Sequence, residues 1–215
     1  DKMSKSLGNV IDPFELATKF GTDCVRWTLL REVVPGNDGD FSHEALTTRY
    51  NAELANGVGN LLSRTVSMIE KYRNGIVPDR GTVANELDAS VETNVPTEVK
   101  GFEDSMDRWE FAKALNAVNR LVGVLDDYVD KSAPWALAKA NDPRLDRVLF
   151  NLAEGLRIVS ILVEPFIPGS ARKMREWLGV SADQSWQHVG WGGTAAGTKV
   201  TKGAALFPRI EAPKA

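Results

Sequence analysis

Two lysines lie three positions apart near the start of the chain, in the segment Lys2-Met3-Ser4-Lys5-Ser6. A flexible loop with two ammonium groups and two hydroxyls can neutralise a polyphosphate and donate hydrogen bonds to it. The same composition also suits a solvated, lysine-rich terminus. Charge alone favours the solvated terminus over the phosphate site.

A second set of candidate residues lies on a long amphipathic stretch. Asn56, Asn60 and Arg64 follow one another at intervals of four residues, beside an apolar face that includes Leu61. An amide and a fork-shaped guanidinium one helical turn apart can together recognise the edge of an unpaired base. By themselves, such residues are more often a solvated polar stripe.

Trp135 is the third candidate, since it follows Pro134 in the first turn of a short expected helix. A tryptophan that projects from a bundle is a stacking platform for an unpaired base. The alternative is a tryptophan buried in the core. We expect core positions for most of the other five, namely Trp27, Trp109, Trp177, Trp186 and Trp191.

Metal and nucleophile chemistry find little support in the sequence. The two histidines, His43 and His188, lie far apart, and one cysteine cannot complete a zinc site with them. Cys24 sits beside Val25 on a helical pattern, which favours burial. We expect His43 to be solvated and the chain to hold no metal.

These candidates must be positioned by helices, because apolar residues recur at the helical period along most of the chain. Pro96 is expected to divide the helix at 82–105, and Ser132 is expected to cap the helix that begins at 133. Beyond residue 180 the chain becomes rich in Gly and Thr. The predicted fold class is all-α, a helical bundle with a small non-bundle segment at each end. The expected helices span residues 12–20, 22–32, 42–73, 82–105, 108–130, 133 onward, 145–163 and 169–178.

Composition places the 215 residues among soluble globular chains, with 43% apolar and 26% charged residues. No apolar run approaches the length of a membrane span. The net charge is −3, and acidic residues are concentrated in residues 81–110. A broad basic face for nucleic acid is therefore excluded, whereas a local RNA site is compatible with the charge.

The string KMSKS resembles the ATP-binding signature loop of class I aminoacyl-tRNA synthetases, and the LGNVIDP that follows is typical of that class. Three further segments resemble the methionyl-tRNA synthetase family, and the resemblance covers about residues 1–180. A last match, ALFPRI, lies near the C-terminus. The three segments are DCVRWTLLREVVPGNDGDFSHEAL, RYNAELANGVGNLLSRTVSMI and APWALAK.

The resemblance implies an ATP site on the first loop. It places Lys5 on the ATP phosphates with Lys2 in support, and Met3, Ser4 and Ser6 complete the loop. ATP would be accompanied by Mg²⁺ in the full-length enzyme. The lysines would stabilise the charge that develops on pyrophosphate while methionine is adenylated.

The resemblance also implies an anticodon site. The NLLSR string maps onto Asn60 and Arg64 as anticodon-reading residues, and APW maps onto Trp135 as a stacking residue. The implied partners are the elongator and initiator methionine tRNAs, with no membrane partner. The implied location is cytoplasmic.

The family's Rossmann catalytic domain, with its His-x-Gly-His type element, finds no counterpart in these residues. We therefore expect the chain to be part of a longer methionine–tRNA ligase and to be inactive by itself. Its expected domains are a loop and stem-contact segment at 1–41, a helical anticodon-binding domain at 42–180, and a Gly-rich extension at 181–215 that packs back on the chain.

Two other interpretations remain open from the sequence. The chain could come from another class I synthetase, of the isoleucine or valine type, whose bundle would recognise a different anticodon. It could also be a non-catalytic helical RNA-binding or scaffold module that keeps the loop as a relic. Binding of a panel of tRNA transcripts would distinguish the first alternative from a methionine enzyme. The sequence upstream of Asp1 would distinguish the second alternative from part of a synthetase.

Overall fold

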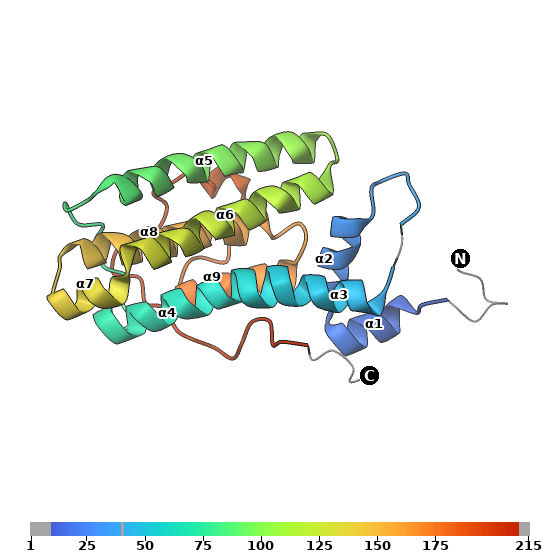
Figure 1. The fold of residues 1–215 in the computed structure, drawn as a ribbon, viewed down its shortest axis with the longest axis horizontal. Coiled ribbons are helices and arrows are strands. Elements are labelled where there is room, and N and C mark those ends of the chain that lie inside the picture. Colours follow the sequence, from blue (N-terminus) through green and yellow to red (C-terminus); the bar gives the residue numbers. More distant parts are fainter. Residues whose placement is uncertain (1–9, 40, 211–215) are drawn as a thin grey trace.

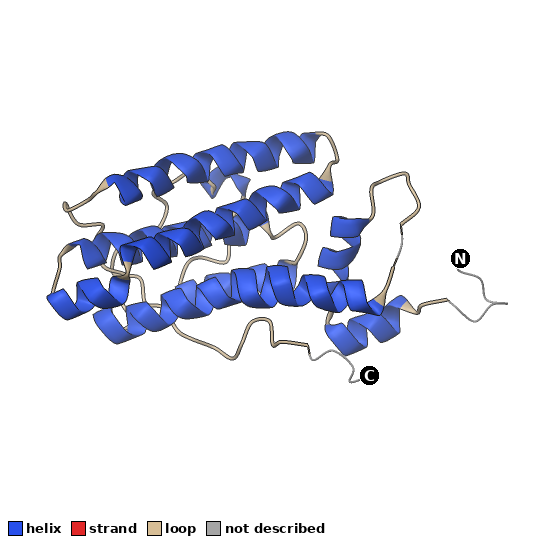
Figure 2. Cartoon of the chain, in the orientation of Figure 1, coloured by secondary structure: helices blue, strands red, loops and turns tan. Residues whose placement is uncertain are grey.

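The computed structural model describes residues 10–39 and 41–210, and these form a bundle of helices (Figure 1). Within these two ranges there is no strand, and β pairing is limited to one isolated bridge between Ile76 and Lys199 (Figure 2). The all-α prediction is confirmed. No helix in the described part is long and apolar enough to span a bilayer.

Two short helices come before the bundle, α1 (Pro13–Phe20) and α2 (Thr22–Glu32). Asp12 caps α1 by accepting a hydrogen bond from the backbone N–H of Phe14, 2.8 Å away. Gly21 separates the two helices with a φ of 87°, a conformation that L side chains rarely adopt. The two helices pack together at one end of the bundle (Figure 1).

A long rod follows, but it is not the single α-helix that the sequence predicts for 42–73. It consists of α3 (His43–Arg49), the π-helix η2 (Tyr50–Gly59) and α4 (Asn60–Arg73). Buried residues recur every four positions at Leu46, Tyr50, Leu54 and Val58. Leu62 and Val66 continue this spacing in α4, so one buried face runs through α3, η2 and α4.

Helices α5 (Glu86–Asp107) and α6 (Phe111–Ser132) form an antiparallel pair (Figure 1). Pro96 lies inside α5, so the predicted division there is wrong. A proline in a helix interior removes one backbone hydrogen bond. Packing of α5 along α6, with Val95 and Phe102 buried on either side of Pro96, holds the helix together despite this loss.

The remaining helices are α7 (Pro134–Ala140), α8 (Arg144–Leu162), α9 (Pro168–Leu178) and the 3₁₀ turn η3 (Trp186–His188). Almost every side chain of α8 is buried, so α8 is the central helix of the core. α8 contacts α4, α5, α6, α7 and α9. Burial on all sides distinguishes α8 from the amphipathic helices around it.

Residues 198–210, here called the C-terminal strap, run along the outside of the long rod, first beside α4 and then beside η2 (Figure 1). At one end, the backbone N–H of Val200 donates to the carbonyl of Gly75 over 2.8 Å. Farther along, the ring of Phe207 is buried against Tyr50, with ring centroids 6.0 Å apart. A Cβ on Gly59 would lie 3.1 Å from that ring, so the absence of a side chain at Gly59 leaves space for Phe207.

Candidate nucleic-acid interface

The expected phosphate-binding residues lie outside the described part of the chain. Lys2, Met3, Ser4, Lys5 and Ser6 all fall in residues 1–9, whereas α1 starts at Pro13. Their assignment to ATP therefore stays a prediction. Among the described residues, no group of His, Cys, Asp and Glu could hold a metal ion.

Asn60 and Arg64 lie on the first turns of α4. Asn60 is the first residue of that helix and is exposed, and Arg64 lies one α-helical turn farther on. Their shared face follows from regular α geometry, since both residues lie beyond the π-helix. Asn56 lies before this boundary, in η2, where its side-chain oxygen accepts two hydrogen bonds from Arg209.

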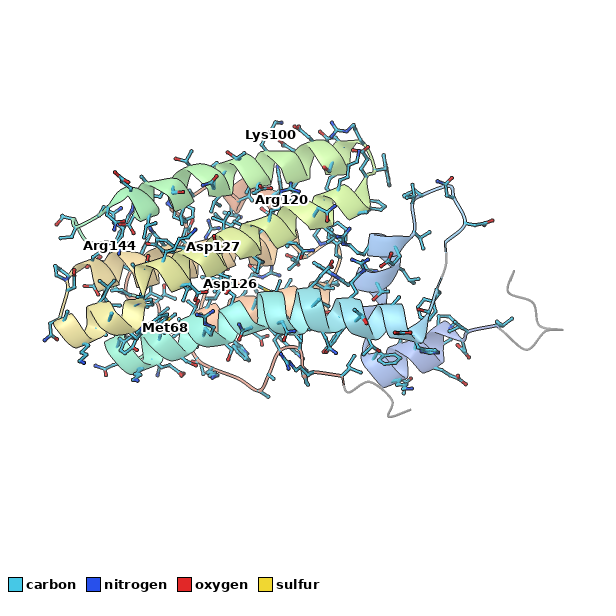
Figure 3. All side chains as sticks on the ribbon, viewed as in Figure 1. Met68, Lys100, Arg120, Asp126, Asp127 and Arg144 are labelled. Atoms are coloured by element: carbon cyan, nitrogen blue, oxygen red, sulfur yellow. The ribbon has the colours of Figure 1, made fainter. Side chains whose placement is uncertain are left out.

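Trp135 and Arg64 line one groove between α4 and α7. The groove has a volume of about 370 Å³, and the Trp135 side chain is 49% exposed beside it. Met68 on α4 belongs to the same groove, on the side that faces α7 (Figure 3). Asn60 lies one turn away and does not line it. The complete lining comprises Ser63, Arg64, Ser67, Met68, Tyr72, Trp135 and Lys202.

A tight turn between α6 and α7 presents Trp135. Ala133 has a φ of 44° and ends α6, and Pro134 begins α7 with its ring buried. Ser132 does not cap α7, contrary to the expectation, because it is the last residue of α6 and Ala133 occupies the N-cap position. Its buried hydroxyl accepts a hydrogen bond from Arg144. Anchoring on both sides of Ala133 leaves the next side chain, Trp135, facing outward.

Acidic side chains of α6 hold Arg64 in place. One guanidinium nitrogen lies 2.8 Å from Asp130 and another 3.4 Å from Asp126. Burial raises the pKa of Asp126 to about 6, Arg64 partly opposes this shift, and the charges of Asp130 and Asp127 add to it. Asp126 lies on the side of α6 that is next to α4 (Figure 3), whereas Asp127 is exposed and pairs with Lys131 on its own helix.

The sequence prediction missed these acidic partners. The signal available for them was the LDDYVD string, which places two carboxylates four residues apart on the helix before Trp135. Their role is visible only once α6 is seen to lie beside α4. The pair orients the guanidinium fork and offsets its charge.

Three of the other five tryptophans pack in or against the core, as expected for most of them, and two are exposed. Trp27 and Trp177 are buried and Trp191 is half-buried, but Trp109 is 70% and Trp186 41% exposed. Trp109 occupies the turn between α5 and α6 with a φ of 58°, which turns its side chain away from the core. An exposed tryptophan is therefore not unique to the groove.

Two smaller expectations are confirmed. Cys24 is buried, and burial raises the pKa of its thiol to about 12, which keeps it protonated. His43 is exposed, and its ring lies between Phe20 and Phe41 with centroids 6.0 and 5.7 Å away. Neither residue takes part in the groove.

The groove combines the features that bind unpaired nucleotides. Trp135 provides an exposed indole with a flat apolar surface, and Arg64 places a guanidinium fork on the same groove. The exposed amide of Asn60 lies one turn earlier on α4. Proteins recognise single-stranded RNA loops by stacking bases on aromatic rings and by hydrogen bonding their edges.

Two family models match the sequence. One, described as tRNA synthetases class I (M), matches residues 1–66. The other, described as the anticodon binding domain of methionyl tRNA ligase, matches residues 77–214. The second match covers most of the chain and includes α7 with Trp135.

Curated relatives agree with these models. A methionine–tRNA ligase of Caldanaerobacter subterraneus is 47% identical over 99% of this chain and 34% of its own length. The Bacillus subtilis enzyme of the same name is 42% identical over 98% of this chain and 32% of its own length. The chain thus spans about a third of the length of these relatives.

Solved structures share the fold. The free-state methionyl-tRNA synthetase of Mycobacterium tuberculosis superposes with a TM-score of 0.88 at 35% identity, over 95% of this chain and 42% of that one. The same enzyme in complex with methionyl-adenylate gives a TM-score of 0.89 at 37% identity, over 97% and 42%.

Proposed function

The chain belongs to the family of methionyl-tRNA ligases that carry this anticodon-binding domain, and from this premise we propose that its helical bundle binds the anticodon of methionine tRNA. The proposed site is the groove between α4 and α7. The family match favours methionine over the isoleucine or valine alternatives.

The observation that carries the proposal is the meeting of Arg64 and Trp135 in one groove, although they come from helices far apart in the sequence. We assign stacking of one anticodon base to Trp135 and hydrogen bonding of base edges to Arg64 and Asn60. An exposed amide and a guanidinium offer donors and acceptors that differ between bases.

We further propose that the whole protein is a methionine–tRNA ligase, which activates methionine with ATP and transfers it to tRNA as an ester. Lys5 and Lys2 would neutralise the ATP phosphates, Mg²⁺ would accompany ATP, and Met3, Ser4 and Ser6 would shape the loop. The relatives' greater length supports a Rossmann catalytic domain elsewhere in the protein. A cytoplasmic location accords with this role.

The proposed organisation follows the expectation from the sequence. Residues 1–41 would carry the ATP loop and contact the tRNA stem, residues 42–180 would bind the anticodon, and residues 181–215 would support the bundle. The 215-residue chain alone should then fail to catalyse methionine-dependent ATP–pyrophosphate exchange. Exchange clearly above a control without protein would contradict this division of labour.

Binding of anticodon stem–loop RNAs tests the proposed function directly. The affinity of the chain is measured for a methionine stem–loop with a CAU anticodon and for the same RNA with its first anticodon base changed. We expect tighter binding of the CAU stem–loop, by roughly 1–3 kcal/mol for one good base contact. Equal affinity for both RNAs, or a preference for isoleucine or valine anticodons, would overturn the proposal.

A further inference from the structure

The centre of the groove carries little positive charge to hold an RNA. Arg64 is the lining residue on α4 that carries a charge, and it is already paired with Asp130 and Asp126. Each nucleotide of a bound loop brings a phosphate, and phosphate contacts supply much of the affinity for RNA. A groove that reads bases with Arg64 therefore needs other cations for the backbone.

The C-terminal strap places one such cation at the groove itself. Lys202 lines the groove together with Arg64 and Trp135, and its Nζ lies 2.7 Å from the Ser67 hydroxyl. The nearby Glu70 accepts the backbone N–H of Lys202, at 3.1 Å, rather than its ammonium group. Among the ion pairs of residues 10–39 and 41–210, none involves Lys202.

A second cation of the strap lies beside Asn56, four residues before Asn60. Arg209 is exposed, and its Nε and Nη2 donate to the Asn56 side-chain oxygen over 3.0 and 2.6 Å. A guanidinium has five N–H donors, so several remain for a ligand. Asn56 precedes the exposed Asn60 by four residues. Arg209 thus adds positive charge near Asn60 without using a carboxylate partner in the described part of the chain.

The strap is attached firmly enough to hold both cations in place. Between them, Phe207 is buried against Tyr50 and Gly59. Next to Arg209, the backbone N–H of Ile210 donates to the Asn51 side chain over 3.0 Å, and the Asn51 amide donates back to the Ile210 carbonyl over 2.8 Å. Backbone bonds on both sides limit the entropy lost when an RNA binds.

We infer that Lys202 and Arg209 bind phosphates of the anticodon loop, while Asn60, Arg64 and Trp135 contact its bases. This inference rests on the proposed function, because it assumes that the loop lies along α4. It assigns the strap a binding role rather than only a packing role. Affinity and base discrimination would then reside on different segments of the chain.

Salt dependence separates the two roles. The affinities of the CAU stem–loop and of the RNA with a changed first base are measured between about 50 and 200 mM salt. We expect Lys202→Gln and Arg209→Gln each to lower the log–log salt slope by roughly 0.7 unit, the value for one phosphate of a single strand. Each variant should weaken both RNAs by the same factor, so that their ratio stays unchanged.

Lys113→Gln is the matched control, because it removes one exposed lysine at the end of α6 that lies away from α7. It should keep the wild-type slope. Lys202→Arg and Arg209→Lys preserve the charge and should restore most of the slope. Thermal unfolding of every variant identifies any loss of the strap's packing.

The outcomes distinguish the inference from the proposed function. Slopes of Lys202→Gln and Arg209→Gln equal to that of Lys113→Gln would overturn the inference even if the wild type prefers CAU. A loss of base discrimination with an unchanged slope would also overturn it, because the residues would then contact bases. A wild type without CAU preference would instead overturn the proposed function.

Discussion

The guanidinium of Arg144 donates a hydrogen bond to the hydroxyl of Ser132, 3.0 Å away, where α6 ends and the helix with Trp135 begins. The same guanidinium pairs with Asp88 on α5, whose carboxylate also accepts the Tyr128 hydroxyl. Burial raises the pKa of Asp88, but the hydrogen bonds from Arg144 and Tyr128 outweigh it, so the pKa lies below its ordinary value. This buried network fixes the start of α7.

Asp88→Asn should destabilise the fold by about 3–5 kcal/mol at pH 7, because it leaves the Arg144 charge buried without a partner. Since the folded-state pKa is lowered, the carboxylate contributes its stability above its ordinary pKa of 3.8 and loses it as the pH falls further. Urea unfolding at several pH values measures this. The gap between wild type and variant should close in acid, and a constant gap would contradict the assignment.

Trp135→Ala should weaken binding of the CAU stem–loop by about 1–3 kcal/mol, the value for one base stacked on an aromatic ring. The melting temperature should change little, because Trp135 is 49% exposed. Loss of a core tryptophan would instead cost about 3–5 kcal/mol of stability. Trp109→Ala is the matched control, since Trp109 is more exposed and lies at the opposite end of α6. Weaker RNA binding by both variants would remove the special role of Trp135.

Arg64→Ala and Asn60→Ala should reduce the preference for CAU over the RNA with a changed first base. The physical reason is that base-edge contacts discriminate, by roughly 1–3 kcal/mol each, whereas phosphate contacts do not. Affinity measurements with both RNAs give the ratio. If each variant weakens both RNAs equally, these residues do not read the anticodon.

Asp126→Asn should stabilise the fold at pH 7, because burial raises the carboxyl pKa to about 6 and makes its ionised form unfavourable. As the pH falls from about 6 toward 3.8, the folded protein takes up a proton that the unfolded chain does not, so wild-type stability rises. Asn cannot titrate, and Arg64 keeps its contact with Asp130. Chemical unfolding across this range should show the two stabilities converging in acid.

Much of the fold follows from local patterns in the sequence. The Asp12-Pro13 start of α1 and the apolar face of α6 both follow rules that act within a few residues. Pro96 shows the limit, because its local cost is outweighed by contacts with a neighbouring helix. The π-helix likewise depends on packing in the core, where its buried residues contact other helices.

The sequence predicts the residues of the site only as separate pieces, without the contacts between them. Asn60 and Arg64 share a helix, so their spacing alone relates them, and Trp135 follows a recognisable turn. The pairing of Arg64 with Asp130 and the approach of Lys202 depend on how distant segments meet. No local pattern specifies such contacts, which is why the acidic and basic neighbours of the groove were missed.

The π-helix has a consequence for any attempt to transplant the recognition residues. A residue removed from η2, or a replacement of Tyr50–Gly59 by an ideal α-helix of equal length, changes the rotational phase of α4 relative to α3. One residue corresponds to about 100° around an α-helix, since each turn holds 3.6. Arg64 would then point away from the groove and Asn60 would turn with it, although both side chains remained present. A chimaeric domain must therefore inherit η2 together with α4, even though no residue of η2 lines the groove.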